Sequence, residues 1–253
     1  MIRPEVPAKM LLQALREEVL EANLELVRRG LVLYTFGNVS GIDRSQGLVA
    51  IKPSGVAYED LTPEKIVVTD LEGKIVDGGL RPSSDLATHL ELYKHFEKIG
   101  GVAHTHSEYA TAWAQAETEI PCFGTTHADY FRGPVPVTQP LSAEEIAGDY
   151  ERETGLAICR IFREVDPEAI PAVLVAGHAP FCWGANAAAA AHNAVTLEYV
   201  ARMACHTLSI NAESRPLPPV LRDRHFLRKH GGAAYYGQAK PQGNAAAETE
   251  AKR

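Results

Sequence analysis

The sequence predicts a domain of the α/β or α+β class, in which strands and helices alternate along the chain. Short apolar runs typical of buried strands, such as residues 172–176, are separated by stretches with the periodicity of amphipathic helices, such as residues 11–29. The chain has 253 residues, of which 45% are hydrophobic and 23% charged, a composition that suits one large core. Some strands are joined by short turns and others by helices, so this pattern leaves the strand directions open.

The N-terminal third is predicted to contain one helix followed by several strands. The helix spans residues 11–29 and ends at Gly30, and its apolar stripe is formed by Leu12, Leu15, Val19 and Leu20. Residues 31–35 and 48–51 are expected to be strands, and the first of them leads into a loop over residues 37–41. Residues 66–76 are expected to form a β-hairpin that turns at Glu72-Gly73.

The remaining two thirds are predicted to be mainly helical. A helix follows Pro82-Ser83-Ser84-Asp85 and stops by Gly100, and a short helix contains Tyr109 and Trp113. Three longer helices are expected. The first is opened by a capping box at residues 142–145 and runs towards Val165. An Ala-rich helix runs from Asn186 to about Leu208, and a last helix runs from about Pro219 through Arg228. Residues 240–253 lack apolar periodicity and are expected to be disordered, which leaves residues 1–239 as one domain.

Composition excludes several classes of partner. The net charge of −7 argues against nucleic acid or an anionic membrane surface. No segment approaches the roughly 18 consecutive apolar residues that a membrane-spanning helix needs. The four cysteines lie far apart and form no CxxC motif, so they are expected to be reduced, mostly buried thiols in a cytoplasmic protein: Cys122, Cys159, Cys182 and Cys205.

Three histidines stand at the ends of expected strands. His104 and His106 close the apolar run 99–103, and side chains two residues apart on a strand point to the same face. His178 follows the run 172–176. With a carboxylate nearby, these imidazoles would make a catalytic zinc site with room for substrate. The spacing alone is equally compatible with two surface histidines and one core histidine.

Three turns rich in small residues could bind a phosphate group, at Gly37-Asn38, Ser54-Gly55 and Ser83-Ser84. Such turns expose backbone N–H groups, and their hydroxyl and amide side chains add donors. Ordinary turn and capping roles are the better explanation for any one of these turns taken alone. Asp85 either complements the dipole of the helix that it opens or places a carboxylate near a metal. No phosphate-loop or dinucleotide fingerprint occurs, and no G-x-S-x-G motif supports a serine hydrolase.

Two further segments carry candidate acid/base groups. Asp129 lies in a loop of polar and aromatic residues at positions 125–131, where His127 could orient it or act on its own. His225 and Arg228 share one face of the last helix. In the segment that follows, Tyr235 is better explained as a surface aromatic than as a general acid.

Seven segments, in this order, resemble the class II aldolase/adducin family: GNVS (37–40), IKPSG (51–55), PSSD (82–85), HTH (104–106), TTHADYF (125–131), GHAPF (177–181) and RKHGGAAYYGQ (228–238). The likeness runs from about Leu11 to Gln238, and TTHADYF and AYYGQ resemble the epimerase branch of the family. The resemblance implies a three-layer α/β/α fold around a mainly antiparallel sheet. It also implies a homotetramer with active sites at the subunit interfaces.

The resemblance assigns roles to individual positions. It implies zinc, with Mn²⁺ as another divalent candidate, bound by His104, His106 and His178 with Asp85 beside the metal. The substrate and phosphate loops would hold Asn38, Lys52, Ser54, Gly55, Ser83 and Ser84. Asp129 and Tyr236 match an acid/base pair, and Thr125, His225 and Arg228 match supporting positions that reach a neighbouring subunit's site. Ala176 stands where many relatives have a further histidine.

The implied activity is the interconversion of L-ribulose 5-phosphate and D-xylulose 5-phosphate, as in arabinose catabolism. The hydrogen on C4 is not acidic and no nicotinamide site is evident, so inversion would need cleavage and re-formation of the C3–C4 bond. Zinc would act as the Lewis acid. The alternatives are an aldolase of the L-fuculose-phosphate kind, an epimerase of a related pentose or ascorbate pathway, and a non-catalytic module like the adducin head.

Overall fold

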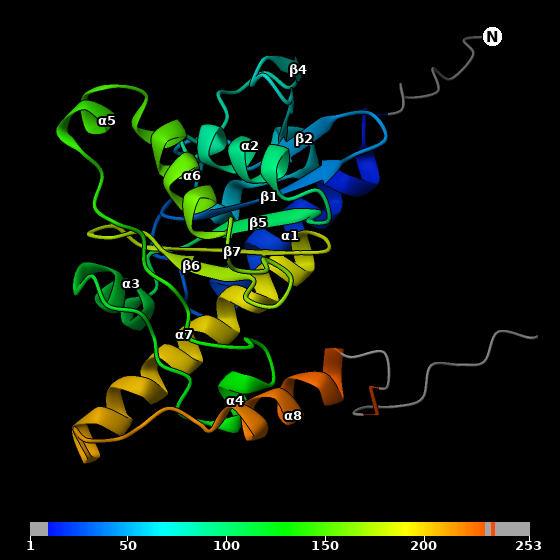
Figure 1. The fold of residues 1–253 in the computed structure, drawn as a ribbon. Coiled ribbons are helices and arrows are strands. Elements are labelled where there is room, and N and C mark those ends of the chain that lie inside the picture. The colour runs from blue at the N-terminus through cyan, green and yellow to red at the C-terminus, as the bar shows by residue number, and fades with distance from the viewer. Residues whose placement is uncertain (1–9, 231–233, 236–253) are drawn as a thin grey trace, which may run out of the picture.

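The computed structural model, which describes residues 10–230 and 234–235, is built around a seven-stranded sheet (Figure 1). The strand order is β4-β3-β2-β1-β5-β7-β6, and every neighbouring pair is antiparallel. The strands are β1 (Asn38–Asp43), β2 (Leu48–Ile51), β3 (Val67–Asp70), β4 (Ile75–Asp77), β5 (Gly101–His104), β6 (Ala172–Leu174) and β7 (Pro180–Gly184). The sheet therefore has the mainly antiparallel character that the family resemblance implied.

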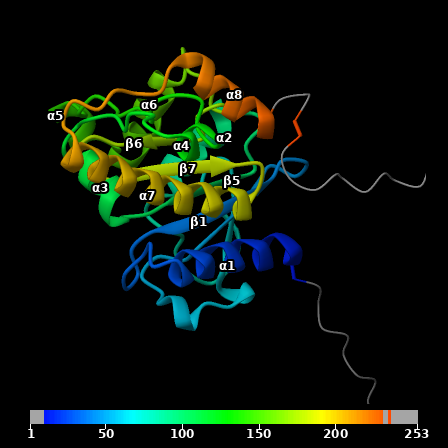
Figure 2. The ribbon, with the colours of Figure 1, turned by 90° about the horizontal axis from the view of Figure 1, so that it is seen from below.

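Helices cover both faces of the sheet. They are α1 (Gln13–Arg28), α2 (Leu86–His95), α3 (Glu108–Gln115), α4 (Thr125–Ala128), α5 (Ala143–Ala147), α6 (Tyr150–Ile161), α7 (Ala187–Ile210) and α8 (Pro219–His230). The helices α2 and α6 pack together on one face, and α1 and α7 pack together on the other (Figures 1 and 2). The apolar core lies between these layers, so the expected α/β/α arrangement is confirmed.

The predicted strand over residues 31–35 is wrong, because the chain is irregular there. The Leu31 N–H donates to the Leu26 carbonyl and so helps to end α1, and Tyr34 adopts a left-handed conformation with φ of 53°. Leu31 is buried in the core, whereas Leu33 and Tyr34 are exposed, so the side chains do not show the regular alternation of a half-buried strand. Hydrophobicity alone therefore gave the wrong assignment.

The predicted loop over residues 37–41 is also wrong, because Asn38 begins the central strand β1. This strand pairs with β2 on one side and with β5 on the other, so its backbone groups are satisfied on both edges. Its buried polar side chains, Asn38 and Ser40, form hydrogen bonds with residues at and after the start of α2. Such polar residues are rare in a buried strand, which is why the sequence indicated a loop.

The expected helix from residue 143 to Val165 is divided in two. The capping box at Ser142 and Glu145 forms as predicted, but α5 ends at Ala147. Gly148 then leaves the helical region, and the Asp149 side chain accepts a hydrogen bond from the Arg152 N–H at the start of α6. The strand β7 was not predicted, whereas Asn186 caps α7 as expected.

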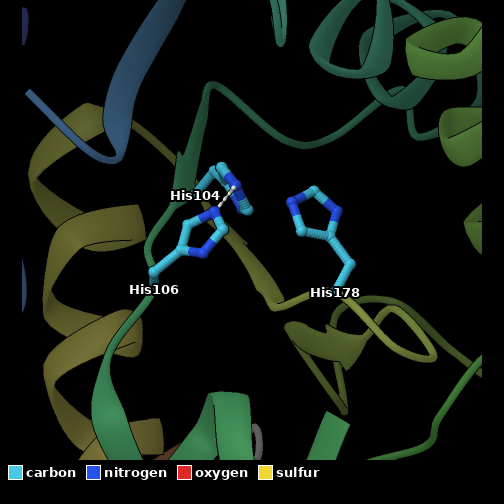
Figure 3. Close-up of side chains that lie close together, drawn as sticks. All are labelled: His104, His106 and His178. Atoms are coloured by element: carbon cyan, nitrogen blue, oxygen red, sulfur yellow. Dashed lines mark hydrogen bonds between the residues drawn. The ribbon is translucent and has the colours of Figure 1, made fainter. Parts of the chain in front are cut away.

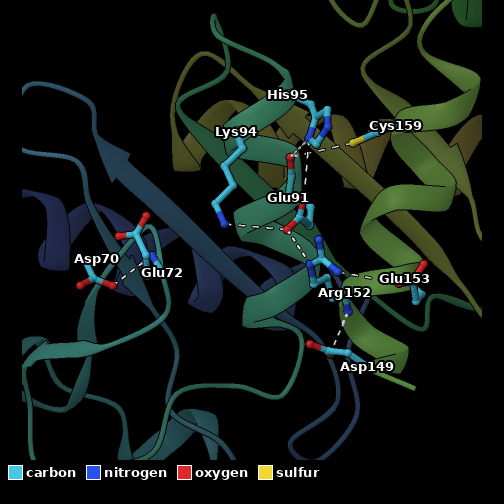
Figure 4. A network of polar contacts seen from close by, with 9 residues as sticks. All are labelled: Asp70, Glu72, Glu91, Lys94, His95, Asp149, Arg152, Glu153 and Cys159. Carbon is cyan, nitrogen blue, oxygen red and sulfur yellow. Dashed lines mark hydrogen bonds and ion pairs between the residues drawn. The ribbon is translucent and has the colours of Figure 1, made fainter. Parts of the chain in front are cut away.

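A buried carboxylate joins α2 to α6 (Figure 4). The Glu91 side chain on α2 lies 3.3 Å from Nε of Arg152 on α6, and Lys94 and His95 of its own helix complete the ion cluster. This contact places the first residues of α6 at the edge of the candidate site described below.

No helix in the described ranges has the length and apolar composition needed to cross a bilayer. The four cysteines are free thiols, and three of them are buried, as expected. The predicted disordered tail, residues 240–253, lies outside the described residues.

Candidate metal and phosphate site

Three imidazoles converge at one end of the sheet (Figure 3). His104 ends β5, His106 follows two residues later, and His178 lies in the turn between β6 and β7. One nitrogen from each ring lies within 4.8 Å of the others, and the Nε2 atoms of His104 and His106 are 3.1 Å apart. The histidine cluster therefore has the geometry of a metal site.

The sheet register explains this convergence. β5 pairs with β7 so that His104 lies opposite Phe181, whose ring stacks on the His104 ring with centroids 4.1 Å apart. The β6–β7 turn contains Gly177 at φ of 66°, a conformation that favours glycine, and it brings His178 next to His104. The predicted role of strand ends in gathering the histidines is confirmed.

The hydrogen bonds of the cluster leave ring nitrogens free for a cation. His104 Nδ1 lies 2.9 Å from the Pro180 carbonyl, which can only accept, so Nδ1 carries the proton and Nε2 presents a lone pair to the cluster. Nδ1 of His178 is buried without a hydrogen-bond partner among the described residues.

Burial favours the neutral form of two histidines of the cluster, His106 and His178. Burial and the neighbouring His104 lower the pKa of His178 to about 4, and the same two causes lower the pKa of His106. A neutral imidazole is the form that binds a metal. Two nitrogens bound to one tetrahedral zinc ion lie about 3.3 Å apart, close to the separation found here. The donor set thus fits a zinc ion held by three nitrogens with a position left open.

Asp85 lies beside the cluster. Within the described part of the chain, the group of ligand atoms that lie within 4.8 Å of one another comes from the three histidines and does not include the Asp85 carboxylate. The Asn38 amide donates to Asp85 Oδ2 at 2.6 Å, and the Ser83 hydroxyl donates to the same oxygen at 3.4 Å. Burial raises the pKa of Asp85, but the fields of His104 and His89 and the Asn38 hydrogen bond outweigh this effect and lower it. The carboxylate is therefore ionised near the candidate metal position.

The cluster opens into a cavity of about 420 Å³. The three histidines and Asp85 line it together with all six positions expected in the substrate and phosphate loops: Asn38, Lys52, Ser54, Gly55, Ser83 and Ser84. Turns that are far apart in the sequence thus meet at one place. A pocket with hydroxyls, backbone N–H groups and one lysine suits a phosphate dianion.

Lys52 is buried at this cavity, with its ammonium 4.8 Å from the centre of the Tyr58 ring. Burial lowers the pKa of Lys52 from 10.5 to about 8. A desolvated cation attracts an anion more strongly than one in water.

Sequence reasoning missed four cavity residues: Thr35, Phe36, Tyr150 and Glu151. Thr35 ends the segment that was predicted to be a strand, and Phe36 follows it, with its ring 6.1 Å from the His106 ring. Tyr150 and Glu151 begin α6, and the Tyr150 ring lies 6.3 Å from that of His178. No motif marked the two α6 residues, because the break at Gly148 that exposes this helix start was not predicted.

A second polar cluster surrounds Asp129, and none of its members lines the cavity. Arg228 contacts both carboxylate oxygens, at 3.0 and 2.7 Å, and His225 Nδ1 lies 3.0 Å from Oδ1. Burial raises the pKa of Asp129, but the hydrogen bonds from Arg228 and His225 outweigh it and hold the pKa below its usual value. We refer to Asp129, His225 and Arg228 as the Asp129 cluster.

The Asp129 cluster joins α4 to α8, which lie far from α2 in Figure 1. Thr125 begins α4 and is also outside the cavity lining. Tyr236, the expected partner of Asp129, lies outside the described residues. The sequence-predicted residues thus form two separate groups within one chain.

Comparison with known proteins agrees with this fold and site. The model of the family "Class II Aldolase and Adducin N-terminal domain" matches residues 17–205. The chain belongs to the class II aldolase and adducin family. The resemblance found in the sequence motifs is therefore confirmed.

Relatives within the class II aldolase and adducin family include epimerases and aldolases. Two proteins named L-ribulose-5-phosphate 4-epimerase UlaF, from Salmonella paratyphi C and Salmonella typhi, are each 54% identical over 227 residues, which are 90% of this chain and 100% of theirs. A solved L-fuculose 1-phosphate aldolase has a TM-score of 0.71 at 27% identity, covering 85% of this chain and 97% of its own. YgbL from Klebsiella pneumoniae, described as a putative aldolase/epimerase/decarboxylase, has a TM-score of 0.67 at 26% identity and covers 85% and 99%.

Proposed function

We propose that this chain is an L-ribulose-5-phosphate 4-epimerase, which interconverts L-ribulose 5-phosphate and D-xylulose 5-phosphate. The observation that carries the proposal is the single cavity that unites the histidine cluster with the phosphate-type turns. The full-length relatives at 54% identity carry this activity in their names. We take residues 1–239 to be one catalytic domain, a view supported by the single sheet and its continuous core.

The phosphate of the substrate binds at the turns of the cavity in this proposal. Ser54, Gly55, Ser83 and Ser84 offer hydroxyl and backbone N–H donors, and Lys52 supplies the positive charge. Asn38, whose amide already contacts Asp85, lies between this end and the histidine cluster. The phosphate therefore fixes one end of the sugar while the other end faces the imidazoles.

His104, His106 and His178 would hold a zinc ion, with Asp85 beside it, and Mn²⁺ is a second divalent candidate. When bound, the metal supplies Lewis-acid stabilisation of negative charge on the C2 and C3 oxygens of the sugar. The chain itself contributes the imidazoles, the Pro180 carbonyl that orients His104, and the ionised Asp85.

Proton transfer requires groups on both faces of the substrate. The C4 hydrogen is not acidic, so inversion proceeds by breaking the C3–C4 bond, which turns C4 into an aldehyde, and by re-forming it on the opposite aldehyde face. One group takes the proton from the C4 hydroxyl, and another returns a proton to the alkoxide. We assign these roles to Asp129 and Tyr236, with Thr125, His225 and Arg228 in support.

The Asp129 cluster lies outside the cavity of its own chain, so we propose that it completes the site of a second copy. Thr125 and Tyr236 would reach that site from the same neighbouring chain. A homotetramer with cyclic symmetry provides one such contact for each cavity. The distance between the two groups in one chain supports this arrangement.

Product analysis of the purified zinc-loaded protein tests the activity. We expect L-ribulose 5-phosphate to give D-xylulose 5-phosphate and L-fuculose 1-phosphate to react at least 100-fold more slowly. Faster cleavage of L-fuculose 1-phosphate would instead show the second candidate function, an aldolase, which the fold of the solved aldolase favours.

Metal analysis tests the ligand set. We expect the double variant His104→Asn/His106→Asn to lose bound zinc, because only one imidazole of the cluster remains. Stoichiometric zinc in that variant would refute the ligand set. Absence of metal from the unsubstituted protein would favour a non-catalytic module like the adducin head.

A further inference from the structure

A ladder of hydrogen bonds joins β1 to the start of α2. Alternate residues of β1, Asn38 and Ser40, share one face of the strand, and residues at four-residue spacing from Asp85 share one face of the helix. The Asn38 amide donates to Asp85 at 2.6 Å. Ser40 Oγ lies 2.7 Å from His89 Nδ1 and 2.8 Å from the Tyr93 hydroxyl. We call these five residues the β1–α2 ladder.

The proposed reaction gives no role to Ser40, His89 or Tyr93, and His89 is the one of these three with an unpartnered ring nitrogen. It is completely buried, it does not line the cavity, and its Nε2 has no hydrogen-bond partner among the described residues. Burying a ring nitrogen without a partner is unfavourable, and an apolar side chain would fill the same space without that cost. A histidine at this position therefore calls for a function beyond packing.

The surroundings of His89 connect it to the metal site. Its ring packs edge-on against Phe181 at 5.9 Å, and Phe181 stacks on His104. The charges that act on His89 are those of Asp85, one helical turn earlier, and His104. His89 thus lies behind the cavity wall, within electrostatic reach of both the carboxylate and the cluster.

We propose that His89 is a positioning residue that holds the Asp85 carboxylate in place beside the histidine cluster. Its hydrogen bond to Ser40 fixes the rotation of α2 relative to β1 one turn after Asp85. Without that bond, the Ser40–Tyr93 contact joins the two elements only two turns after Asp85, and the carboxylate itself is held by Asn38 and Ser83, which also face the substrate. This inference rests on the proposed metal site, but His89 contacts neither metal nor substrate.

A double-mutant cycle on zinc affinity tests whether His89 acts through Asp85. The zinc dissociation constant of the full-length protein is measured by competition with a chelator for the wild type, Asp85→Asn, His89→Phe and the double variant. Residues that orient metal ligands typically contribute about 10- to 100-fold in affinity. We expect a loss in that range for His89→Phe, and no further loss when it is added to Asp85→Asn, because coupled residues are not additive.

Matched variants separate positioning from packing. His127→Phe replaces another buried histidine, on α4 and outside the cavity, and is expected to leave zinc affinity unchanged. His89→Gln, which keeps a hydrogen-bonding group towards Ser40, is expected to recover part of the affinity. If His89→Phe does not fold, Ser40→Ala takes its place in the cycle, with Tyr93→Phe as its control, because Ser40→Ala removes the hydrogen bonds to both His89 and Tyr93 and Tyr93→Phe removes only the second.

Additive losses in the double variant, or wild-type affinity in a folded His89→Phe protein, would overturn the inference. Both outcomes leave the proposed function intact, since the wild type would still bind zinc and epimerise its substrate. A wild type that binds no zinc would instead contradict the metal site and, with it, the role of His89.

Discussion

At the scale of single residues, burial sets the charge of the groups around the cavity. It keeps His178 and His106 neutral, so they can bind a cation, and it lowers the pKa of Lys52 into the range where it titrates near neutral pH. The ionised Asp85 lines the same cavity. The cavity therefore offers neutral imidazoles that suit a cation and a buried lysine that suits an anion.

The titration of Lys52 predicts how activity depends on pH. The cation is present below its pKa of about 8 and is lost as the pH rises through that value. Because kcat/KM reports groups of the free enzyme, we expect kcat/KM to fall above about pH 8. In Lys52→Met it should be lower at neutral pH and should no longer show this fall. Lys98→Met, which removes an exposed lysine, is the control. An unchanged alkaline limb in Lys52→Met would contradict the assignment.

The ionised carboxylate of Asp129 predicts a loss of turnover without loss of metal. Asparagine cannot transfer a proton, so we expect Asp129→Asn to lower kcat by about 10²- to 10⁴-fold while zinc content stays at the wild-type level. Asp223→Asn removes another carboxylate, which pairs with Arg132, and should change kcat little. Full activity in Asp129→Asn would show that the proton is handled elsewhere.

The histidine cluster and the phosphate turns could be predicted from the sequence, because their residues lie in several short motifs that together, in this order, resemble the class II aldolase and adducin family. The roles of Ser40 and His89 could not, because their contact depends on the pairing of β1 with α2 across 49 residues. Tyr150 was missed for a similar reason, since only the helix break at Gly148 brings it to the cavity.

At the scale of elements, close backbone packing sets the position of β5 and hence of His104. A Cβ atom on Gly101 would lie 2.3 Å from the Asn186 carbonyl oxygen and 2.5 Å from the Ala187 nitrogen at the start of α7. A Cβ atom on Gly37 would lie 2.8 Å from the His104 carbonyl oxygen, and Gly37 has a φ of 77°. Backbone atoms therefore leave no room for a side chain at Gly101, where β5 begins, or at Gly37, which packs against the end of β5.

Gly101→Ala should separate β5 from α7. Because backbone rather than a flexible side chain blocks the added methyl group, we expect the free energy of unfolding to fall by about 3 kcal/mol. Gly124→Ala, where nothing lies within 4 Å of the added atom, should change it by less than about 0.5 kcal/mol. Urea denaturation measures both values, and equal stabilities would contradict the close packing of β5 on α7.

Elements with regular apolar periodicity were predicted well, and those held by tertiary contacts were not. The helices α1 and α7 and the β3–β4 hairpin follow their patterns closely. β1 is polar yet central, because β2 and β5 satisfy its backbone and α2 satisfies its side chains. Residues 31–35 are apolar yet irregular, because they end α1 and lead to the cavity.

At the scale of the whole molecule, the proposal that each site is shared between two chains rests on the separation of two groups of candidate residues. The cavity holds the histidine cluster and the phosphate turns, whereas the Asp129 cluster lies on α4 and α8. Sequence motifs indicate that both groups exist, but they carry no information on how two folded copies meet. The assembly is therefore the part of the account that most needs a direct test.

Mixing two inactive variants tests whether sites are shared between chains. His106→Asn lacks an intact metal cluster, and Asp129→Asn lacks the acid/base group. If each site combines the cavity of one chain with Asp129 of another, random co-assembly makes about a quarter of the sites complete. We expect co-expressed variants to recover about that share of wild-type activity. If oligomers that contain both variants recover no activity, each site uses the cavity and the Asp129 of the same chain, and the proposal of shared sites is contradicted.

The most direct test of the central claim is the approach to equilibrium from both sides. Separate samples of the zinc-loaded protein receive L-ribulose 5-phosphate or D-xylulose 5-phosphate, and the two sugars are quantified over time. A C4 epimerase brings both samples to the same ratio with the total pentose phosphate conserved, and this is the predicted result. Ratios that stay apart, or loss of pentose phosphate to dihydroxyacetone and glycolaldehyde phosphate, would contradict the account.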